Sequence, residues 1–276
     1  MSLAVSLEKN LNKQIQKIAK KHMEHIIALC DDKTLSQDKA IHQIRRRFKK
    51  LRALTHLLQN DLSKSFFKKQ NRIFKECAHS FSASRDQKVL GDTYLEIVRK
   101  YTLDEQTYDT ILQAVRSSKP PLDVNQSFFD IKERLQKNLK TLKHYKMKKN
   151  TKAHFLSCLK KTYQKTDKLR KTAIKKKSDL YFHEWRKWVN YYGFQLFMID
   201  KKEFQEKAEA LKSLAHILGD IHDITVFKAF LHTLDTPLGK AFETFLDKEQ
   251  ALLKEEALKL GEEILLHSPS SDKKCT

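Results

Sequence analysis

The sequence of 276 residues is poor in the residues that break helices or cross-link small folds. It contains only 5 glycines and 4 prolines, so tight turns should be rare and long helices are expected. The four cysteines (Cys30, Cys77, Cys158 and Cys275) are scattered without a CxxC pair, which favours reduced thiols in a cytoplasmic protein. No apolar run approaches the roughly 18 residues of a membrane span, and the N-terminus lacks the apolar core of a signal peptide. We therefore expect neither a disulfide framework nor a membrane-spanning protein.

Acidic residues are also scarce relative to basic ones. Lys and Arg total 55 against 34 Asp and Glu, which gives a formal net charge of +21. Such an excess predicts a polyanionic partner, for example nucleic acid, polyphosphate or an anionic membrane surface. Hydrophobic residues make up 40% of the chain, so a core can still form.

The scarcity of acids is most pronounced between Ala40 and Asn60, where none occurs. In the segment AIHQIRRRFKKLRALTHLL, apolar residues recur every three or four positions, as on the core-facing stripe of an amphipathic helix: Ile41, Ile44, Phe48, Leu51, Leu54 and Leu58. On a neighbouring face the same spacing places His42, Arg45, Lys49, Arg52 and His56. At about 100° per residue these five residues fall within an arc of about 80°. We call them the cation column.

The cation column has two interpretations. It could be a solvated charged face, but such faces usually mix signs. Five cation-capable side chains along one line repel one another unless an anion lies against them, so we favour an anion site. The side chains should then be exposed and dispensable for folding.

Helical periodicity continues along the whole chain and predicts an all-α fold. Expected helices cover approximately residues 7–30, 40–58, 65–81, 87–100, 104–116, 127–145, 151–177, 182–200, 204–218, 220–234 and 238–267. Polar breaks are expected at the sequence SASRD (82–86) and at Gly219-Asp220. Residues 117–121, SSKPP, form the clearest loop and should separate a first half, 5–117, from a second, 122–267. Residues 268–276 should be a disordered tail.

The two halves contain matching segments in the same order. DKAIHQIRRRF, residues 38–48, matches DLYFHEWRKWV, residues 179–189, with His42 on His183, Arg45 on Arg186 and Arg46 on Lys187. KECAHSFSASRDQKVL matches KSLAHILGDIHDITVF, with Asp86 on Asp223. Two ordered matches predict a duplicated bundle in which the two basic helices meet at a shared groove.

The repeated pattern H-x-x-R-[RK], present as HQIRR and HEWRK, resembles the CHAD domain, the conserved histidine α-helical domain. The segments LKKTYQKTDKLRK (159–171) and LGDIHDITVF (218–227) also resemble parts of that family. The resemblance covers about residues 5–267 as a single domain. It implies two pseudo-symmetric four-helix bundles with a basic central groove, binding of inorganic polyphosphate, and association with polyphosphate granules. Asn190 and Gly193 depart from the pattern, since they stand where the second basic helix should repeat Lys and Arg.

The motif and the charge pattern together predict a set of polyphosphate-binding residues: His42, Arg45, Arg46, Lys49, Arg52, Lys160, Lys161, Tyr163, Lys165, His183, Arg186 and Lys187. Arginine and lysine suit a chain of phosphates because they form charge-assisted hydrogen bonds. The two histidines could instead be neutral structural groups, and the three lysines near Tyr163 could be a solvated face. Asp86 and Asp223 are expected to cap a helix or to orient an Arg or His.

Other classes of site have weaker signals. The pairs His22/His25 and His79/His216 lack nearby carboxylates or cysteines in a metal-site pattern, so we expect no metal and no cofactor. The residues Trp185, Trp188 and Tyr192 are expected to pack in the core. A nucleophile with its base and a glycine-rich phosphate loop are both missing from the sequence pattern, so we expect a non-catalytic binding protein. A nucleic-acid-binding protein is the main alternative, and a polyphosphate or triphosphate phosphohydrolase is the third.

Overall fold

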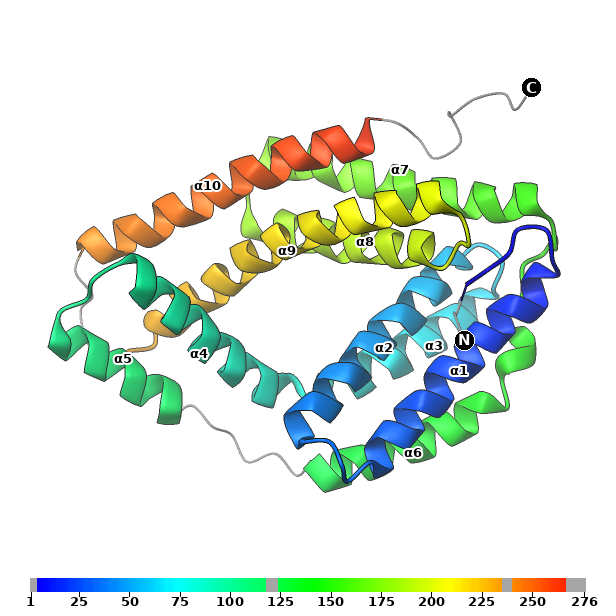
Figure 1. Ribbon diagram of the computed structural model, residues 1–276, viewed down its shortest axis with the longest axis horizontal. Coiled ribbons are helices and arrows are strands. Elements are labelled where there is room, and N and C mark those ends of the chain that lie inside the picture. Colours follow the sequence, from blue (N-terminus) through cyan, green and yellow to red (C-terminus); the bar gives the residue numbers. More distant parts are fainter. Residues whose placement is uncertain (1–3, 118–123, 235–239, 267–276) are drawn as a thin grey trace.

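The computed structural model describes residues 4–117, 124–234 and 240–266, within which the side chains of residues 82–87 and 240 are not described. Its helices are α1 (Leu11–Asp31), α2 (Gln37–Leu57), α3 (Lys64–His79), α4 (Ser82–Lys100), α5 (Glu105–Ser117), α6 (Val124–Leu139), α7 (Lys152–Lys176), α8 (Asp179–Phe197), α9 (Lys202–Leu231) and α10 (Lys240–Leu265), with a 3-10 turn η1 (Leu142–His144) (Figure 1). The described residues include no strand and only one isolated β-bridge, between Val5 and Ile199. The prediction of an all-α fold is confirmed.

Local sequence signals account for several helix starts. The side chains of Asn10, Ser63 and Thr151 each accept a hydrogen bond from a backbone N–H in the first turn of α1, α3 and α7. Ser36 occupies the corresponding position before α2 but makes no such bond. For α2, burial of its apolar stripe therefore contributes more than capping does.

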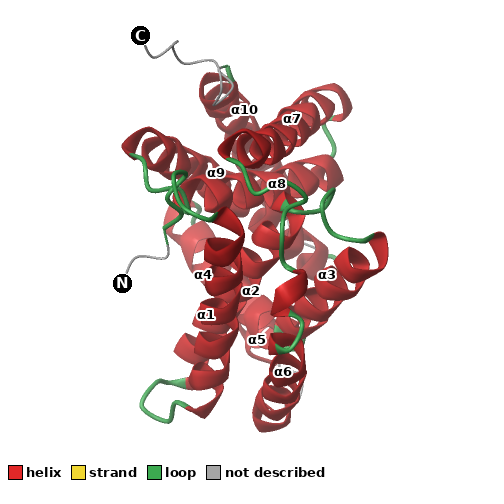
Figure 2. Cartoon of the chain, turned by 90° about the vertical axis from the view of Figure 1, so that its right-hand side faces the viewer, coloured by secondary structure: helices red, strands yellow, loops and turns green. Residues whose placement is uncertain are grey.

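The helices contact one another in two groups. In the first, α1, α2, α3 and α6 pack together; in the second, α7, α8, α9 and α10 do so (Figure 1). Contact between α2 and α8 joins the groups, and one apolar core extends from Val5 to Leu265 through both. Figure 2 shows α7 and α10 above α8 and α9, with the first group below them.

The helices α4 and α5 leave the first group and pack against the second. A separate apolar cluster joins Tyr94 of α4, Ile111 of α5, Phe227 of α9 and Leu246 of α10. Helix α6 follows the predicted loop at 117–121 but lies against α1. The two groups of contacting helices are therefore not separated at that loop. A pseudo-symmetric duplication of two bundles is not confirmed.

The structure is helical at both predicted polar breaks, although a turn at residues 80–81, just before the first of them, does separate α3 from α4. Residues 82–86 open α4, and Gly219-Asp220 lies inside the continuous helix α9. A glycine costs a helix only about 1 kcal/mol, whereas α9 buries an apolar stripe from Phe204 to Leu231. The expected helix 127–145 instead ends as α6 at Leu139. Residues 118–121 of the predicted loop and the predicted tail at 268–276 lie outside the described residues.

Candidate functional site

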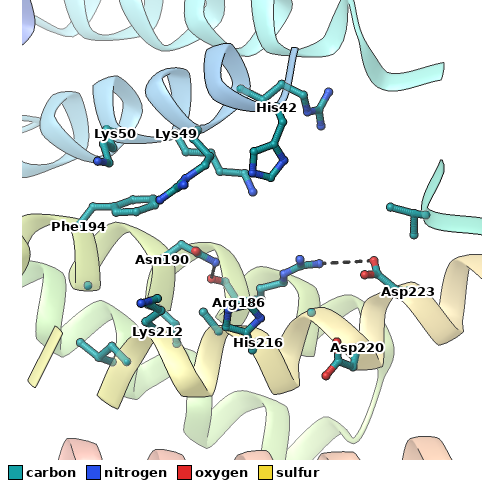
Figure 3. Close-up of a pocket in the computed structure, with 18 of the residues that line it drawn as sticks. His42, Lys49, Lys50, Arg186, Asn190, Phe194, Lys212, His216, Asp220 and Asp223 are labelled. Atoms are coloured by element: carbon teal, nitrogen blue, oxygen red, sulfur yellow. Dashed lines mark hydrogen bonds and ion pairs between the residues drawn. The ribbon is translucent and has the colours of Figure 1, made fainter. Parts of the chain in front are cut away.

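A pocket of about 830 Å³ lies between α2, α4, α8 and α9. The charged and imidazole side chains that line it are Asp38, His42, Arg45, Arg46, Lys49 and Lys50 from α2; Lys88 and Asp92 from α4; Arg186 from α8; and Glu209, Lys212, His216, Asp220 and Asp223 from α9. Figure 3 shows His42 and Lys49 extending from α2 toward Arg186 on α8 and His216 on α9. The pocket thus unites residues from both halves of the sequence.

Packing of α2 determines which of its residues line this pocket. The predicted apolar stripe is fully confirmed, since Ile41, Ile44, Phe48, Leu51, Leu54 and Leu58 are all buried. With that stripe in the core, the neighbouring face carrying His42, Arg46 and Lys49 is exposed and faces α8 and α9. Trp185, Trp188 and Tyr192 of α8 are also buried, as predicted.

Arg45 differs from the expectation of a fully exposed side chain that folding does not need. It is half-buried, and its Nη1 donates a hydrogen bond of 2.7 Å to the carbonyl oxygen of Ala78 near the end of α3. A charged donor to a backbone carbonyl at a helix C-terminus stabilises that terminus. Arg45 therefore both lines the pocket and ties α2 to α3.

Cations crowd one another along the α2 wall. Desolvation is the largest cause that lowers the pKa of His42, and Arg46, Lys49, Lys88 and Arg45 lower it further. The pKa of Lys50 is lowered by desolvation and then by Arg46 and Arg47. An anion in the pocket would relieve this repulsion, because it would favour the charged form of each group.

The opposite wall, formed by α8 and α9, has mixed charge. Arg186 lies 4.0 Å from the Asp223 carboxylate, and its backbone carbonyl accepts a hydrogen bond from Asn190 Nδ2. A methyl group added at Gly219 would lie 3.1 Å from Arg186 Nη2, so this glycine gives the guanidinium room beside α9. The pKa of Asp220 is raised by desolvation and by the nearby Glu96 and Asp223. Anions should therefore bind closer to α2 than to α9.

The far end of the cation column turns away from the pocket. Arg52 Nε donates to Asn71 Oδ1 on α3 at 3.2 Å, and the guanidinium lies 5.6 Å from the centre of the Tyr191 ring. The His56 imidazole stacks on the same tyrosine with a centroid distance of 4.6 Å, and burial is the main reason its pKa falls to about 4. These two residues therefore help pack α2 against α3 and α8.

The α7 residues in the predicted binding set do not line the pocket. Lys160 and Lys161 are exposed, and Lys165 lies 5.8 Å from the Trp188 ring centre. The Tyr163 hydroxyl donates to the carbonyl oxygen of Leu265 at 2.9 Å, which fastens the end of α10 to α7. Tyr163 thus makes a packing contact here.

Two further α8 residues of the predicted set also point elsewhere. His183 is exposed and lies beside His222, with ring centres 4.4 Å apart. Lys187 forms an ion pair with Glu184 on its own helix at 2.7 Å. Asp223 is in the interior of α9, so it pairs with Arg186 rather than capping a helix. The side chain of Asp86 lies outside the described residues.

Sequence reasoning missed several pocket residues. Lys50 follows Arg46 by four positions, so these two residues form a second line of cations on the helix beside the cation column. This spacing could have predicted Lys50 as a pocket residue. Lys88, Lys212 and His216 come from α4 and α9, and the sequence pattern singled out only His216, in the pair His79/His216 that was weighed as a metal site. No local pattern connects these helices to α2.

In the comparison with protein families, the CHAD domain matches residues 17–232 of the chain. Because this range covers most of the 276 residues, the chain belongs to the CHAD domain family. No curated protein matches the chain, and neither does any solved structure. Within the described ranges, none of the helices is both long and apolar enough to cross a bilayer.

Proposed function

We propose that this protein binds inorganic polyphosphate, or a similar flexible polyanion, in the pocket along α2, without hydrolysing it. The observation that carries the proposal is the α2 wall, where Arg45, Arg46, Lys49 and Lys50 converge with His42 on one pocket. Membership of the CHAD family supports the same ligand, since the resemblance implies polyphosphate binding. A protein of this kind would associate with polyphosphate granules in the cytoplasm.

The chemistry of the wall suits a chain of phosphates. Polyphosphate carries a negative charge at each unit and offers no base to read, so recognition needs many cations along one line. Guanidinium and ammonium groups supply charge-assisted hydrogen bonds to phosphate oxygens. The release of counterions from the polyanion adds a favourable contribution to the free energy of binding, and this contribution becomes smaller as the salt concentration rises.

Nucleic acid is the main competing ligand. A net charge of +21 attracts any polyanion, and Phe197 at the pocket edge is 52% exposed, as a base-stacking residue would be. A duplex is rigid and broad, however, whereas the crowded cations lie within a pocket of about 830 Å³. A thin flexible chain fits this arrangement better.

Competition at matched phosphate concentration separates these ligands. Labelled polyphosphate bound to the protein at raised salt should resist displacement by duplex DNA and by single-stranded nucleic acid, and should yield to unlabelled polyphosphate. Equal or better competition by nucleic acid would overturn the proposal. Phosphate release above background with Mg²⁺ or Mn²⁺ would instead identify a phosphohydrolase.

Charge reversal of two exposed pocket residues tests the site itself. Arg46→Glu with Lys49→Glu should weaken polyphosphate binding by at least about tenfold, since like charges now face the ligand. Lys68→Glu with Lys69→Glu, on exposed positions of α3 outside the pocket, is the matched control and should change affinity little. Helical circular dichroism and thermal melting should stay close to wild type in both variants. Unchanged affinity in the pocket variant would show that α2 is not the binding wall.

A further inference from the structure

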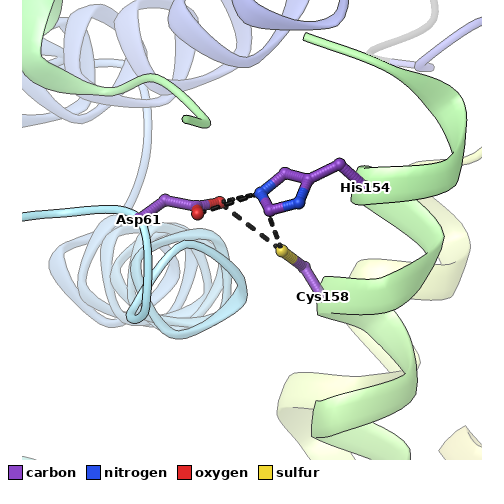
Figure 4. A group of neighbouring side chains, drawn as sticks. All are labelled: Asp61, His154 and Cys158. Carbon is purple, nitrogen blue, oxygen red and sulfur yellow. Dashed lines mark hydrogen bonds and ion pairs between the residues drawn. The ribbon is translucent and has the colours of Figure 1, made fainter. Parts of the chain in front are cut away.

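A second cluster of reactive side chains lies at the other end of α2 from His42. His154 and Cys158 are four residues apart on α7, so both point from one face of that helix. Asp61 belongs to the turn between α2 and α3 and reaches the same face (Figure 4). None of the three lines the polyanion pocket.

The three side chains are close together and largely buried. His154 Nε2 lies 2.9 and 3.0 Å from the two Asp61 oxygens, while Cys158 Sγ lies 3.5 Å from Asp61 Oδ2 and 3.9 Å from His154 Nε2. The Asp61 side chain is only 2% exposed and Cys158 is 3% exposed. The His154 side chain is 22% exposed, so the cluster has one edge near solvent.

This triangle has nearly the dimensions of three corners of a zinc tetrahedron. Bonds of about 2.3 Å to sulfur and about 2.0–2.1 Å to nitrogen and oxygen place tetrahedral ligand atoms about 3.3–3.6 Å apart. The observed separations lie on both sides of that range and need shifts of only a few tenths of an ångström. Their chemistry also fits, because thiolate, imidazole and carboxylate are all zinc ligands.

We propose that Asp61, His154 and Cys158 bind a divalent transition-metal ion of the zinc class, with water as the fourth ligand. Without an ion, His154 and the Cys158 thiol both hydrogen-bond to the Asp61 carboxylate, and a bound ion would replace these contacts with a bond to each of the three groups. Burial is the main reason that the pKa of the Cys158 thiol is raised to about 12 without an ion. Metal binding would replace the thiol proton and release it to solvent.

The position of the site suggests what the ion does. Asp61 follows α2 by a few residues, and α7 belongs to the second group of helices. A bound ion would therefore cross-link the two groups at a point where α2 and α7 make few other contacts. It would act as a structural clamp beside the helix that carries the cation column.

Cobalt provides a direct probe of this site. The full-length chain, reduced and stripped with chelator, should bind one Co²⁺ with a thiolate-to-cobalt charge-transfer band, which Zn²⁺ then removes by displacement. Cys158→Ser should abolish that band. Cys30→Ser, at a half-buried cysteine far from Asp61 in the sequence, is the matched thiol control and should keep the band. Zinc should raise the melting temperature of wild type and of the control but not of Cys158→Ser.

The outcomes are decisive even if one variant folds poorly. His154→Gln and Asp61→Asn should each weaken cobalt binding by more than the roughly 10–100-fold that losing an outer hydrogen-bond partner costs. Wild type without a thiolate band would overturn the proposal, as would a band that survives in Cys158→Ser. Weak cobalt binding without the thiolate-to-cobalt band would also overturn it, because the metal would then be bound by other histidines.

Discussion

His42 illustrates how a single residue reports the charge of its pocket. Its pKa lies below the usual value because of desolvation and because Arg46, Lys49, Lys88 and Arg45 surround it. The imidazole is therefore mostly neutral in the unliganded protein near pH 7. A bound polyanion would favour the protonated form and raise this pKa.

Affinity should consequently depend on pH in a defined direction. Because the complex has the higher His42 pKa, binding takes up a proton, so polyphosphate affinity should rise as pH falls through the pKa of the complex. The gain should level off below the lower pKa of the unliganded protein. The raised pKa of Asp220 acts in the same direction, since its protonation removes a repelling charge.

Titrations between about pH 8 and pH 5 at constant ionic strength would measure this effect. His42→Gln should flatten the pH dependence, whereas His232→Gln, at an exposed histidine outside the pocket, should not. A wild-type profile that His42→Gln leaves unchanged would assign the proton uptake to another group.

Close packing of α10 against α8 depends on Gly261, which has no side chain. A methyl group added at Gly261 would lie 2.6 Å from Cη2 and Cζ2 of Trp185, a fully buried ring on α8. Neither the ring nor the helix can move away without disturbing the core. Glycine at this position lets α10 approach α8 closely.

Substitution by alanine should therefore have opposite effects at two helical glycines. Gly261→Ala should lower the free energy of unfolding by about 1–3 kcal/mol through overpacking. Gly91→Ala, in α4, should raise it by up to about 1 kcal/mol, because the nearest atom to the new methyl is Val115 Cγ1 at 4.0 Å. Chemical denaturation of both variants checks this, and a stabilised Gly261→Ala would refute the close contact.

Across the whole molecule, the net charge of +21 is spread over many helices, but only some of the cations share the pocket. Arg46 and Lys49 line it, whereas Lys160 and Lys161 are exposed on α7 and do not. Cations that contact phosphate release counterions on binding, and distant ones do so weakly. The salt dependence of affinity should therefore identify the binding helix.

Replacing Arg46 and Lys49 by Gln should reduce the slope of log affinity against log salt by roughly one unit or more, at about 0.7 per contact for a single-stranded polyanion. Replacing Lys160 and Lys161 by Gln should leave the slope close to wild type. Equal reductions in the two variants would mean that α7 shares the ligand, as the predicted binding set with Lys160 and Lys161 requires.

The helical class and the inward face of α2 follow from the sequence alone. Few glycines and prolines and a regular apolar period leave little alternative to helices, and the stripe from Ile41 to Leu58 is buried as its spacing predicts. The acid-free cation column likewise correctly predicts that His42, Arg45 and Lys49 face one side of α2. These features depend on local geometry, which a helix period specifies.

Which cations share a pocket was decided by tertiary packing. Arg52 belongs to the same column as Lys49, yet it turns toward Asn71 and Tyr191 because α3 and α8 meet α2 at that level. Asp220 and Asp223 line the same pocket wall as Lys212 and His216 because α9 continues through Gly219, where the sequence predicted a break. Asp61 meets His154 and Cys158 only because the turn after α2 packs against α7. Contacts between residues so far apart depend on how helices dock, and no local period encodes docking.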